Sequence, residues 1–406
     1  MKVLVFNVKY SENLGDGLLA ECVEAALASR GGEIEVETID LAGRRAFAAG
    51  HGARRRLALG FLSQLPSHAR RRFVRAALEN RLSRLQTEWD AKIAAADAVV
   101  IGGGNLFQDD DLNFPLKIAT VLDCVLRHDR PLAIYAVGVS KHWSKEAYDL
   151  FARLKRARLA HLSVRDVFAQ DAWRDHFPEG PDPKLVRDPG LLVQALPTNV
   201  KPLALPKRQM TVGICVTDPV ILQRHADART ASIPFSAVSA YRDLIGVLLD
   251  DDHRVTLFCN GACEDQAFAQ RIISSVSKHR AVKHGAMDIS RRPLLPDDLV
   301  RTIQSMDVVL AHRLHACIAA YALGVPHVGL GWDKKVEGFF NSVGRENYFV
   351  KDALLPPDQI ASMLKAAQNE GIDALRHEAI IAEARAGISN MRRHLVDYAR
   401  PVMLQV

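Results

Sequence analysis

Residues 3–27 read VLVFNVKYSENLGDGLLAECVEAAL. The apolar run Val3–Phe6 predicts a short buried strand, and the glycines within residues 13–17 (NLGDG) predict a turn. Beyond the turn, apolar residues recur at intervals of three and four, which is typical of a helix with one buried face. A strand, a glycine turn and a helix in this order form the repeating unit of parallel α/β sheets.

The same alternation continues along the chain. Further strands are expected over residues 34–39, 98–101, 131–137, 161–164, 210–216, 254–258, 307–311 and 327–330, with helices between them. This pattern predicts an α/β fold of two doubly wound Rossmann-like domains facing a cleft. The expected boundaries are a first domain over 1–195, a proline-containing linker over 196–209, a second domain over 210–375, and a C-terminal helix within 376–406 that packs back on the first domain.

Length and composition agree with two globular domains. The chain has 406 residues, of which 48% are hydrophobic and 25% charged, and no apolar run approaches the roughly 20 residues of a membrane-spanning helix. Its six cysteines are scattered and include no CxxC pair, so we expect reduced thiols and no zinc site. A cytoplasmic protein without a zinc site is the expectation.

Positive charge is concentrated in one segment. Residues 44–84 contain eleven arginines and a single acid, Glu79, so this Arg-rich insert carries +10 within a chain of net charge +6. Such a segment attracts anionic partners. No zinc-finger or RNA-binding motif accompanies it, so we do not expect a nucleic-acid partner. Leucines and a phenylalanine within residues 57–65 (LALGFLSQL) favour an anionic membrane surface, and a solvated helix face is the alternative.

The strongest chemical motif is HRLH at residues 312–315, where a predicted strand gives way to a helix. Free backbone N–H groups at a helix N-terminus favour an anion. Arg313 can hold a carboxylate or phosphate in a bidentate manner, and His315 can exchange a proton near neutral pH. The lysines of residues 331–338 (GWDKKVEG) follow the next strand and are therefore expected at the same edge of the sheet.

The first half carries matching motifs. Residues 163–166 (SVRD) place Arg165 at a strand end, as Arg313 is placed in the second half, and Asp166 can simply be a helix-capping acid. Two glycine turns, at 13–17 and at 102–105 (GGGN), leave room for a ligand, and three acids follow at residues 109–111. Neither GxGxxG nor a P-loop is present, so no nucleotide cofactor is expected.

These motifs resemble those of the polysaccharide pyruvyl transferases. The similarity rests on NLGDGLLAECVEAAL (13–27), VVIGGGNLFQDD (99–110), LSVRD (162–166) and HRLHACIAAYALGVPHVGLGWDKKVEGFF (312–340). Members of this family resemble GT-B glycosyltransferases and transfer pyruvyl from phosphoenolpyruvate to two hydroxyls of one sugar. The resemblance implies a phosphoenolpyruvate site formed by Arg165, Arg313, Leu314, His315 and Lys335. The family more often has a hydroxyl residue where Ala311 stands.

Chemistry and resemblance together predict a mechanism. His315 is the candidate acid/base, and Asp16 or Asp166 is expected to activate the acceptor hydroxyl. The arginines stabilise the developing charge, so no metal or other cofactor is expected. The expected acceptor is a sugar on a lipid-linked glycan precursor of an exopolysaccharide or cell wall, met at the inner membrane face. The predicted acceptor-binding residues are Asn13, Gly15, Asp16, Gly103, Gly104, Asn105 and Asp109.

Two alternatives remain open from the sequence. One is a GT-B glycosyltransferase that uses a nucleotide sugar, although residues 312–335 contain no glutamate of the kind that retaining enzymes of that class carry in this crevice. The other is a relative that has lost turnover and only binds a glycan or an anion.

Overall fold

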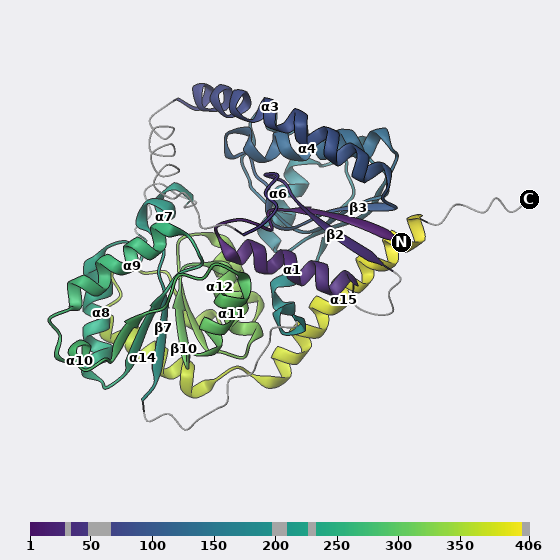
Figure 1. The fold of residues 1–406 in the computed structure, drawn as a ribbon. Coiled ribbons are helices and arrows are strands. Elements are labelled where there is room, and N and C mark those ends of the chain that lie inside the picture. Colours follow the sequence, from purple (N-terminus) through teal and green to yellow (C-terminus); the bar gives the residue numbers. More distant parts are fainter. Residues whose placement is uncertain (29–33, 48–65, 197–208, 226–232, 400–406) are drawn as a thin grey trace, which may run out of the picture.

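The computed structural model of the protein describes residues 1–28, 34–47, 66–196, 209–225 and 233–399. Two parallel six-stranded sheets organise this part of the chain (Figure 1). The first has the order β2-β1-β3-β4-β5-β6 and the second the order β12-β11-β10-β7-β8-β9. In each sheet, the direction in which successive strands are added reverses once, as in doubly wound folds. The reversal lies between β1 and β3 in the first sheet and between β7 and β10 in the second. The predicted α/β class is confirmed.

The first sheet and its helices come from the N-terminal half. The strands are β1 (Lys2–Asn7), β2 (Glu35–Asp40), β3 (Ala98–Phe107), β4 (Leu132–Val139), β5 (Leu159–Val164) and β6 (Lys184–Leu185). The helices are α1 (Leu14–Ala28), α3 (Ser67–Ala94), α4 (Asn113–Arg127), α5 (Lys145–Phe151) and α6 (Val167–His176), with the 3-10 turns η1 (Asp110–Leu112), η2 (Ala152–Arg156) and η3 (Pro189–Ala195).

The second sheet and its helices follow. The strands are β7 (Thr211–Cys215), β8 (Arg254–Phe258), β9 (Met287–Ile289), β10 (Val308–Ala311), β11 (His327–Leu330) and β12 (Phe349–Val350). The helices are α7 (Pro219–His225), α8 (Val238–Asp250), α9 (Cys263–Val276), α10 (Arg280–Lys283), α11 (Pro296–Gln304), α12 (Leu314–Ala322), α13 (Lys334–Ser342), α14 (Pro357–Glu370) and α15 (Ala374–Ala399), with the 3-10 turn η4 (Glu346–Tyr348).

Both faces of the first sheet are buried, which explains its continuous apolar strands. In β1, Val3 and Val5 pack in one cluster with α1, whereas Leu4 and Phe6 pack in another with Trp89 of α3. The first cluster continues through η3 and α12 into the core of the second sheet. A shared apolar core therefore joins the two halves and holds the elements around the site.

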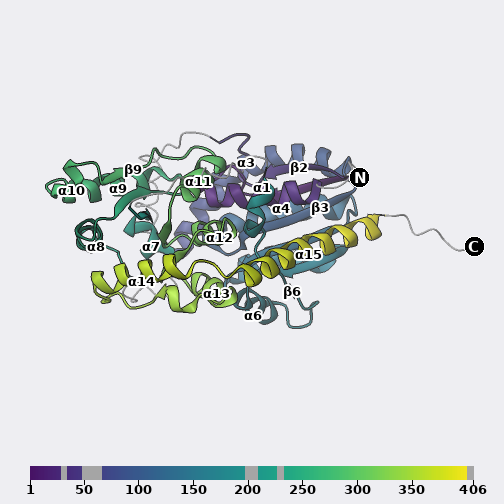
Figure 2. The ribbon, with the colours of Figure 1, turned by 90° about the horizontal axis from the view of Figure 1, so that it is seen from below.

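Helix α15 lies across the junction of the halves (Figures 1 and 2). It begins beside the second half and runs along the first, where it contacts β4, β5 and η3. Arg187 ties it to both halves, because its Nε donates to Glu383 Oε2 at 2.7 Å and its Nη1 donates to the Ser342 carbonyl at 2.9 Å. Helix α15 therefore covers one side of the junction between the two halves.

One expected turn is absent. The prediction ended a strand at Ile101 and placed a turn at residues 102–105, but β3 continues to Phe107. Glycine allows this, because Gly103 and Gly104 adopt φ values of +72° and +95° just before a β-bulge, between Gly104 and Phe107, that shifts the register against β4. The bulge bends the strand without ending it.

Residues 48–65 of the Arg-rich insert and residues 197–208, which make up most of the linker, lie outside the described residues. The described remainder of the insert forms much of α3. Three of its arginines pair with acids of the first half: Arg70 with Asp111 at 2.8 Å, Arg71 with Asp109 at 3.9 Å, and Arg75 with Glu146. No helix in the described ranges has the length and apolarity needed to cross a membrane.

Candidate active site

The site lies where the two sheets approach each other at their reversal points. Helix α1 follows β1 in one sheet and α12 follows β10 in the other, and the N-termini of these helices touch. Gly15 makes this approach possible, because a Cβ there would lie 2.5 Å from His315 Cβ. The Leu14 N–H also donates to the Asn260 carbonyl of the second half at 2.7 Å. Two helix N-termini thus converge, and their free N–H groups favour negative charge between them.

Arg313 is fixed in place by a buried carboxylate. It is the N-cap residue of α12, and its Nη2 donates to Asp265 Oδ2 at 2.6 Å. Asp265 is completely buried, and its Oδ1 accepts from the Asp218 N–H at 2.8 Å. The Arg313 Nε is buried without a hydrogen-bond partner among the described residues. Asp265 therefore fixes the orientation of the guanidinium through Nη2, and the Nε–H remains as a donor for an anionic ligand.

Breaking this buried pair should destabilise the fold. Replacing Asp265 by alanine leaves the guanidinium of Arg313 buried without its partner, and we expect a loss of about 3–5 kcal/mol in the free energy of unfolding, measured by urea denaturation. Asp182 pairs with Arg174 on the surface, and Asp182→Ala should leave the unfolding midpoint nearly unchanged. Equal midpoints for both variants would contradict the structural role of Asp265.

Arg165 approaches the same region from the first sheet. Its side chain is only 4% exposed, with Nη1 3.5 Å from Asp188 Oδ2 and Nε 3.4 Å from Asp166 Oδ2. The guanidinium passes Gly138, where a Cβ would lie 2.9 Å from Nη2. Burial raises the pKa of Asp188 despite the arginine beside it. Arg165 and Arg313 therefore both lie near His315, one from each half, and their joint role in ligand binding stays a prediction.

Lys335 completes the set of cations. It lies in the first turn of α13, with Nζ 2.6 Å from Asp333 Oδ2 and 4.8 Å from the centre of the Trp332 ring. The Trp332 Nε1–H donates to the His312 carbonyl at 2.6 Å, which ties this loop to the start of α12. Asp333 caps α13 by accepting the Lys335 N–H at 2.9 Å. The loop after β11 therefore lies beside the one after β10, as the sequence predicted.

His315 lies among these cations. Its Nδ1 is 3.6 Å from Asp16 Oδ1, and its Nε2 is buried without a hydrogen-bond partner in the described part of the chain. Burial, together with the positive charges of Arg165, Lys335 and Arg313, lowers the pKa of His315 to about 3. Burial raises the pKa of Asp16. In the free protein His315 is therefore neutral at pH 7, and a bound anion would offset the charges that keep it so.

The two candidate catalytic aspartates occupy different places. Asp16 touches His315, as described above. Asp166 caps α6, since its Oδ1 accepts the Ala169 N–H at 2.8 Å, which matches the capping alternative read from the sequence. It also lines a cavity together with Arg165, Leu314 and Lys335. The two carboxylates thus contact different parts of the site.

Several predicted acceptor residues are engaged in packing. Gly103 lies against Leu19, where a Cβ would come within 2.0 Å of Cδ2. Asn13 lies 3.4 Å from the Asn260 amide and 3.3 Å from Asp16. Asp109 Oδ1 accepts the Leu112 N–H at 3.0 Å and its Oδ2 accepts the Ser144 N–H at 2.8 Å. These contacts give Asn13, Gly103 and Asp109 structural roles.

Gly104 and Asn105 differ from these packed residues. A Cβ on Gly104 would meet no atom within 4 Å, and Asn105 reaches Gln108 Oε1 at 2.9 Å through its Nδ2. Asn105 also lies close to Arg165, because both side chains occupy the space that a Cβ on Gly138 would need. Gly104 is buried but has open space on its Cβ side, and Asn105 is partly exposed, so these two residues remain candidates for ligand contact.

Two buried acids of the site, Asp265 and Asp188, were missed by the sequence analysis. Asp265 lies in the first turn of α9, where an acid most often faces solvent. Asp188 precedes Pro189 and caps η3 by accepting the Gly190 N–H at 2.9 Å. Both sit in patterns that predict a capping acid, and only the tertiary structure brings them to an arginine. In the described ranges, no three His, Cys, Asp or Glu side chains gather as metal ligands would.

Solved structures with a similar fold include sugar-nucleotide enzymes. UDP-GlcNAc 2-epimerase from Methanocaldococcus jannaschii superposes with a TM-score of 0.53 at 8% identity, covering 92% of this chain and 94% of its own. TcCGT1 in complex with UDP superposes with a TM-score of 0.50 at 10% identity, covering 98% of both chains. At such low identity the likeness establishes the fold alone, which is GT-B-like.

The sequence comparison is more specific. No curated protein matches the chain in sequence. The family model "Polysaccharide pyruvyl transferase" matches residues 13–334, which include Arg165 and the HRLH motif at 312–315 and end one residue before Lys335. The resemblance inferred from those motifs is therefore confirmed, and the chain belongs to the polysaccharide pyruvyl transferase family.

Proposed function

We propose that the protein transfers the pyruvyl group of phosphoenolpyruvate to two hydroxyls of one sugar in a bacterial exopolysaccharide or cell-wall glycan precursor. The product is a pyruvate ketal, and phosphate is released. The observation that carries this proposal is that three cations from both halves, Arg165, Arg313 and Lys335, lie near enough to His315 to help lower its pKa. Phosphoenolpyruvate has a carboxylate and a phosphate on adjacent sides of a small carbon frame, so it suits cations that approach from both sheets.

In the proposed mechanism, the negative charge of the bound substrate allows His315 to become protonated and act as the acid. The carboxylate and phosphate offset the three cations, so the pKa of His315 rises and the imidazole gains a proton. His315 then protonates C3, which becomes the methyl group and leaves C2 electrophilic. A sugar hydroxyl oxygen bonds to C2, the bond between C2 and the phosphate oxygen breaks, and the second hydroxyl closes the ketal. The two sugar hydroxyls lose two protons in total. One replaces the proton that His315 gave to C3, and the other leaves on the released phosphate.

The two aspartates have separate roles in this mechanism. Asp16, 3.6 Å from His315 Nδ1, stabilises and orients the protonated imidazole. Asp166 faces a cavity beside Arg165 and Lys335 and accepts the proton of the attacking hydroxyl. The guanidinium groups stabilise the charge that develops on the leaving phosphate, so the proposal requires no cofactor.

Loss of either arginine should weaken phosphoenolpyruvate binding. Arg165→Ala or Arg313→Ala removes a charge-assisted hydrogen-bonding partner worth roughly 1.5–3 kcal/mol, which corresponds to a loss in affinity of about 10- to 150-fold by calorimetry. Arg313→Lys keeps a positive charge near Asp265 and serves as the variant that preserves the buried pair. Unchanged affinity in both alanine variants would place the anion site elsewhere.

The alternatives make different predictions in one assay. A nucleotide-sugar glycosyltransferase would transfer the sugar of a UDP-sugar and ignore phosphoenolpyruvate, and a relative without turnover would bind one of them and transfer neither. A mixture containing both labelled donors and a glycan extract therefore separates the three functions. We expect label from phosphoenolpyruvate alone in the glycan.

We also propose peripheral attachment to the inner face of the membrane, where a lipid-linked acceptor is found. Support comes from α3, on which Phe73 is 51% exposed between the exposed arginines Arg72 and Arg75. Each basic residue near an anionic surface contributes about 1 kcal/mol. Co-sedimentation with vesicles containing anionic lipid should fall when Arg72, Arg81 and Arg84 are replaced by alanine. Equal pelleting with neutral vesicles would contradict the proposal.

A further inference from the structure

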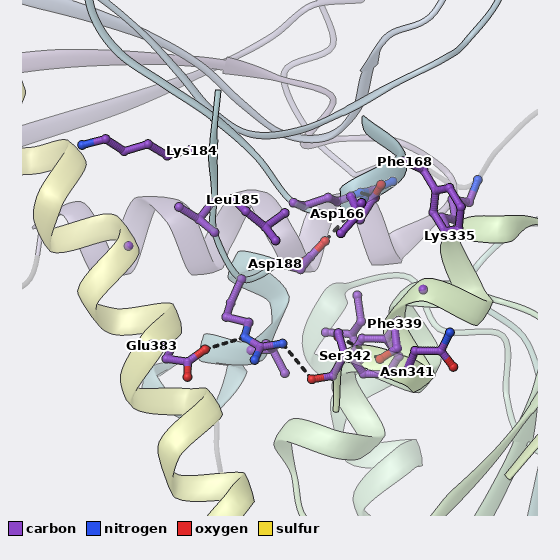
Figure 3. Close-up of a pocket in the computed structure, with 18 of the residues that line it drawn as sticks. Asp166, Phe168, Lys184, Leu185, Asp188, Lys335, Phe339, Asn341, Ser342 and Glu383 are labelled. Carbon is purple, nitrogen blue, oxygen red and sulfur yellow. Dashed lines mark hydrogen bonds and ion pairs between the residues drawn. The ribbon is translucent and has the colours of Figure 1, made fainter. Parts of the chain in front are cut away.

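A cavity of about 770 Å³ lies between the two halves on the side covered by α15. Figure 3 shows α15 with Glu383 on one side of it and Phe168 with Lys335 on the other. Its walls come from the β5–α6 turn, β6, η3, α12, α13 and α15. We call it the α15 cavity. The volume falls in the range of small-molecule sites, about 300–1,000 Å³, and exceeds what a three-carbon phosphate ester needs.

The cavity combines apolar surface with polar groups at its rim. Phe168 and Phe339 present aromatic rings, and Leu185 is 51% exposed at its edge. Asn341 and Asn390 add amides, each of which both donates and accepts hydrogen bonds. A pyranose ring has apolar C–H faces and a rim of hydroxyls, so it can stack on the rings while its hydroxyls bind the amides.

The charges of the lining nearly balance. Its cations are Arg165, Lys184, Arg187 and Lys335, and its acids are Asp166, Asp188 and Glu383. Most of these are already paired: Arg165 lies 3.5 Å from Asp188, Arg187 lies 2.7 Å from Glu383, and Lys335 lies 2.6 Å from Asp333. Such a lining favours a neutral polar ligand over a second strongly anionic one such as a nucleotide diphosphate.

The cavity also reaches the proposed reaction site. Arg165, Leu314 and Lys335 are part of its wall, and Asp166 opens into it. By contrast, the predicted acceptor residues Gly15 and Gly103 are packed against His315 and Leu19. We infer that the acceptor glycan binds in the α15 cavity, with its reactive sugar next to Asp166 and Lys335. This inference rests on the proposed function and assigns the place where its second substrate binds.

The test fills the cavity from the helix that covers it. Ala386 lies on the cavity face of α15, so Ala386→Trp places an indole in the space assigned to the sugar. Ser389, on the same helix, is exposed and does not line the cavity, so Ser389→Trp is the matched control. Both variants are assayed for transfer of radiolabelled pyruvyl from phosphoenolpyruvate to the glycan fraction of bacterial cells, and for phosphoenolpyruvate affinity by calorimetry.

We expect Ala386→Trp to raise the apparent KM for the glycan fraction about tenfold or more, while phosphoenolpyruvate affinity stays as in the wild type. Asn390→Ala, a milder variant on the same wall, should raise this KM without changing the melting temperature. Ser389→Trp should behave as the wild type. Transfer by Ala386→Trp at the wild-type KM overturns the assignment of the cavity. Absence of transfer by the wild type itself overturns the proposed function and this inference with it.

Discussion

His315→Ala and His315→Gln should each reduce pyruvyl transfer about 100-fold or more, because a positioned general acid typically contributes at least that factor. The side chain is 12% exposed and interacts with Asp16 through Nδ1, while its Nε2 has no partner among the described residues. Nε2 is therefore the ring nitrogen that we expect to act on a bound substrate. Transfer rates with saturating phosphoenolpyruvate and glycan measure the effect.

A histidine outside the site provides the control. His284 is exposed at the end of α10, and His284→Ala should transfer at the wild-type rate. Retention of more than about a tenth of the wild-type kcat by His315→Ala would exclude His315 as the acid.

The same histidine should couple substrate binding to proton uptake. The pKa of His315 is about 3 in the free protein, because burial and three cations oppose its protonation. Phosphoenolpyruvate brings negative charge to these cations, so binding near pH 7 should draw a proton from solution. Calorimetric titrations in buffers with different ionisation enthalpies count that proton. His315→Gln should bind with reduced uptake, and equal uptake by wild type and variant would assign the proton to another group.

The second large effect is a loss of stability in mild acid. Four histidines have lowered pKa values, about 4 for His161 and His312 and about 3 for His315 and His327, in each case mainly because of burial. Three of them are buried, and the His315 side chain is 12% exposed. In the unfolded chain these groups take up protons below pH 6.5. Between pH 6.5 and about 4 the unfolded state therefore binds more protons than the folded state, and the free energy of unfolding falls as pH falls.

The size of this effect follows from linkage. Each such histidine removes about 1.4 kcal/mol per pH unit, so four remove on the order of 5 kcal/mol per unit near pH 5. The total stability of a typical protein is about 5–15 kcal/mol. The raised pKa values of Asp16 and Asp188 act in the opposite direction at lower pH, because the folded state then holds their protons. Urea denaturation at a series of pH values measures the slope.

Two substitutions test the origin of the slope. His312 Nε2 contacts the Pro234 carbonyl at 2.7 Å, and His327 Nδ1 contacts the Val325 carbonyl at 3.1 Å. Glutamine and asparagine can place an amide N–H near these two nitrogen positions. The double variant His312→Gln/His327→Asn should therefore keep both hydrogen bonds and lose about half of the pH dependence. A slope equal to that of the wild type would contradict the assignment to these groups.

Most of the fold could be predicted from the sequence because buried parallel strands are continuous apolar runs. The expected ranges 254–258 and 327–330 coincide with β8 and β11. The short edge strands β6, β9 and β12 were not predicted, since two or three residues carry no period. The turn predicted at the GGGN stretch (102–105) was wrong, because glycines are equally compatible with a turn and with a bulged strand.

The placement of the candidate residues was predictable where they sit at strand ends. Arg313 and Lys335 follow β10 and β11, which are neighbours in the second sheet, and Arg165 follows β5 of the first sheet and lines one cavity with Lys335. The roles of Asp265 and Asp188 depend on contacts between residues far apart in sequence, so no local pattern could identify them. Gly15 was expected to line a ligand site, but its lack of a side chain serves the close approach of α1 to α12.

The most direct test of the account is the identity of the donor. The full chain is incubated with a bacterial glycan fraction, radiolabelled phosphoenolpyruvate and a differently labelled UDP-sugar, and label in the glycan is counted together with released phosphate. The account predicts that label from phosphoenolpyruvate enters the glycan with one phosphate released per pyruvyl transferred, and that His315→Ala abolishes both signals. Label from the UDP-sugar in the glycan, with none from phosphoenolpyruvate, would contradict it.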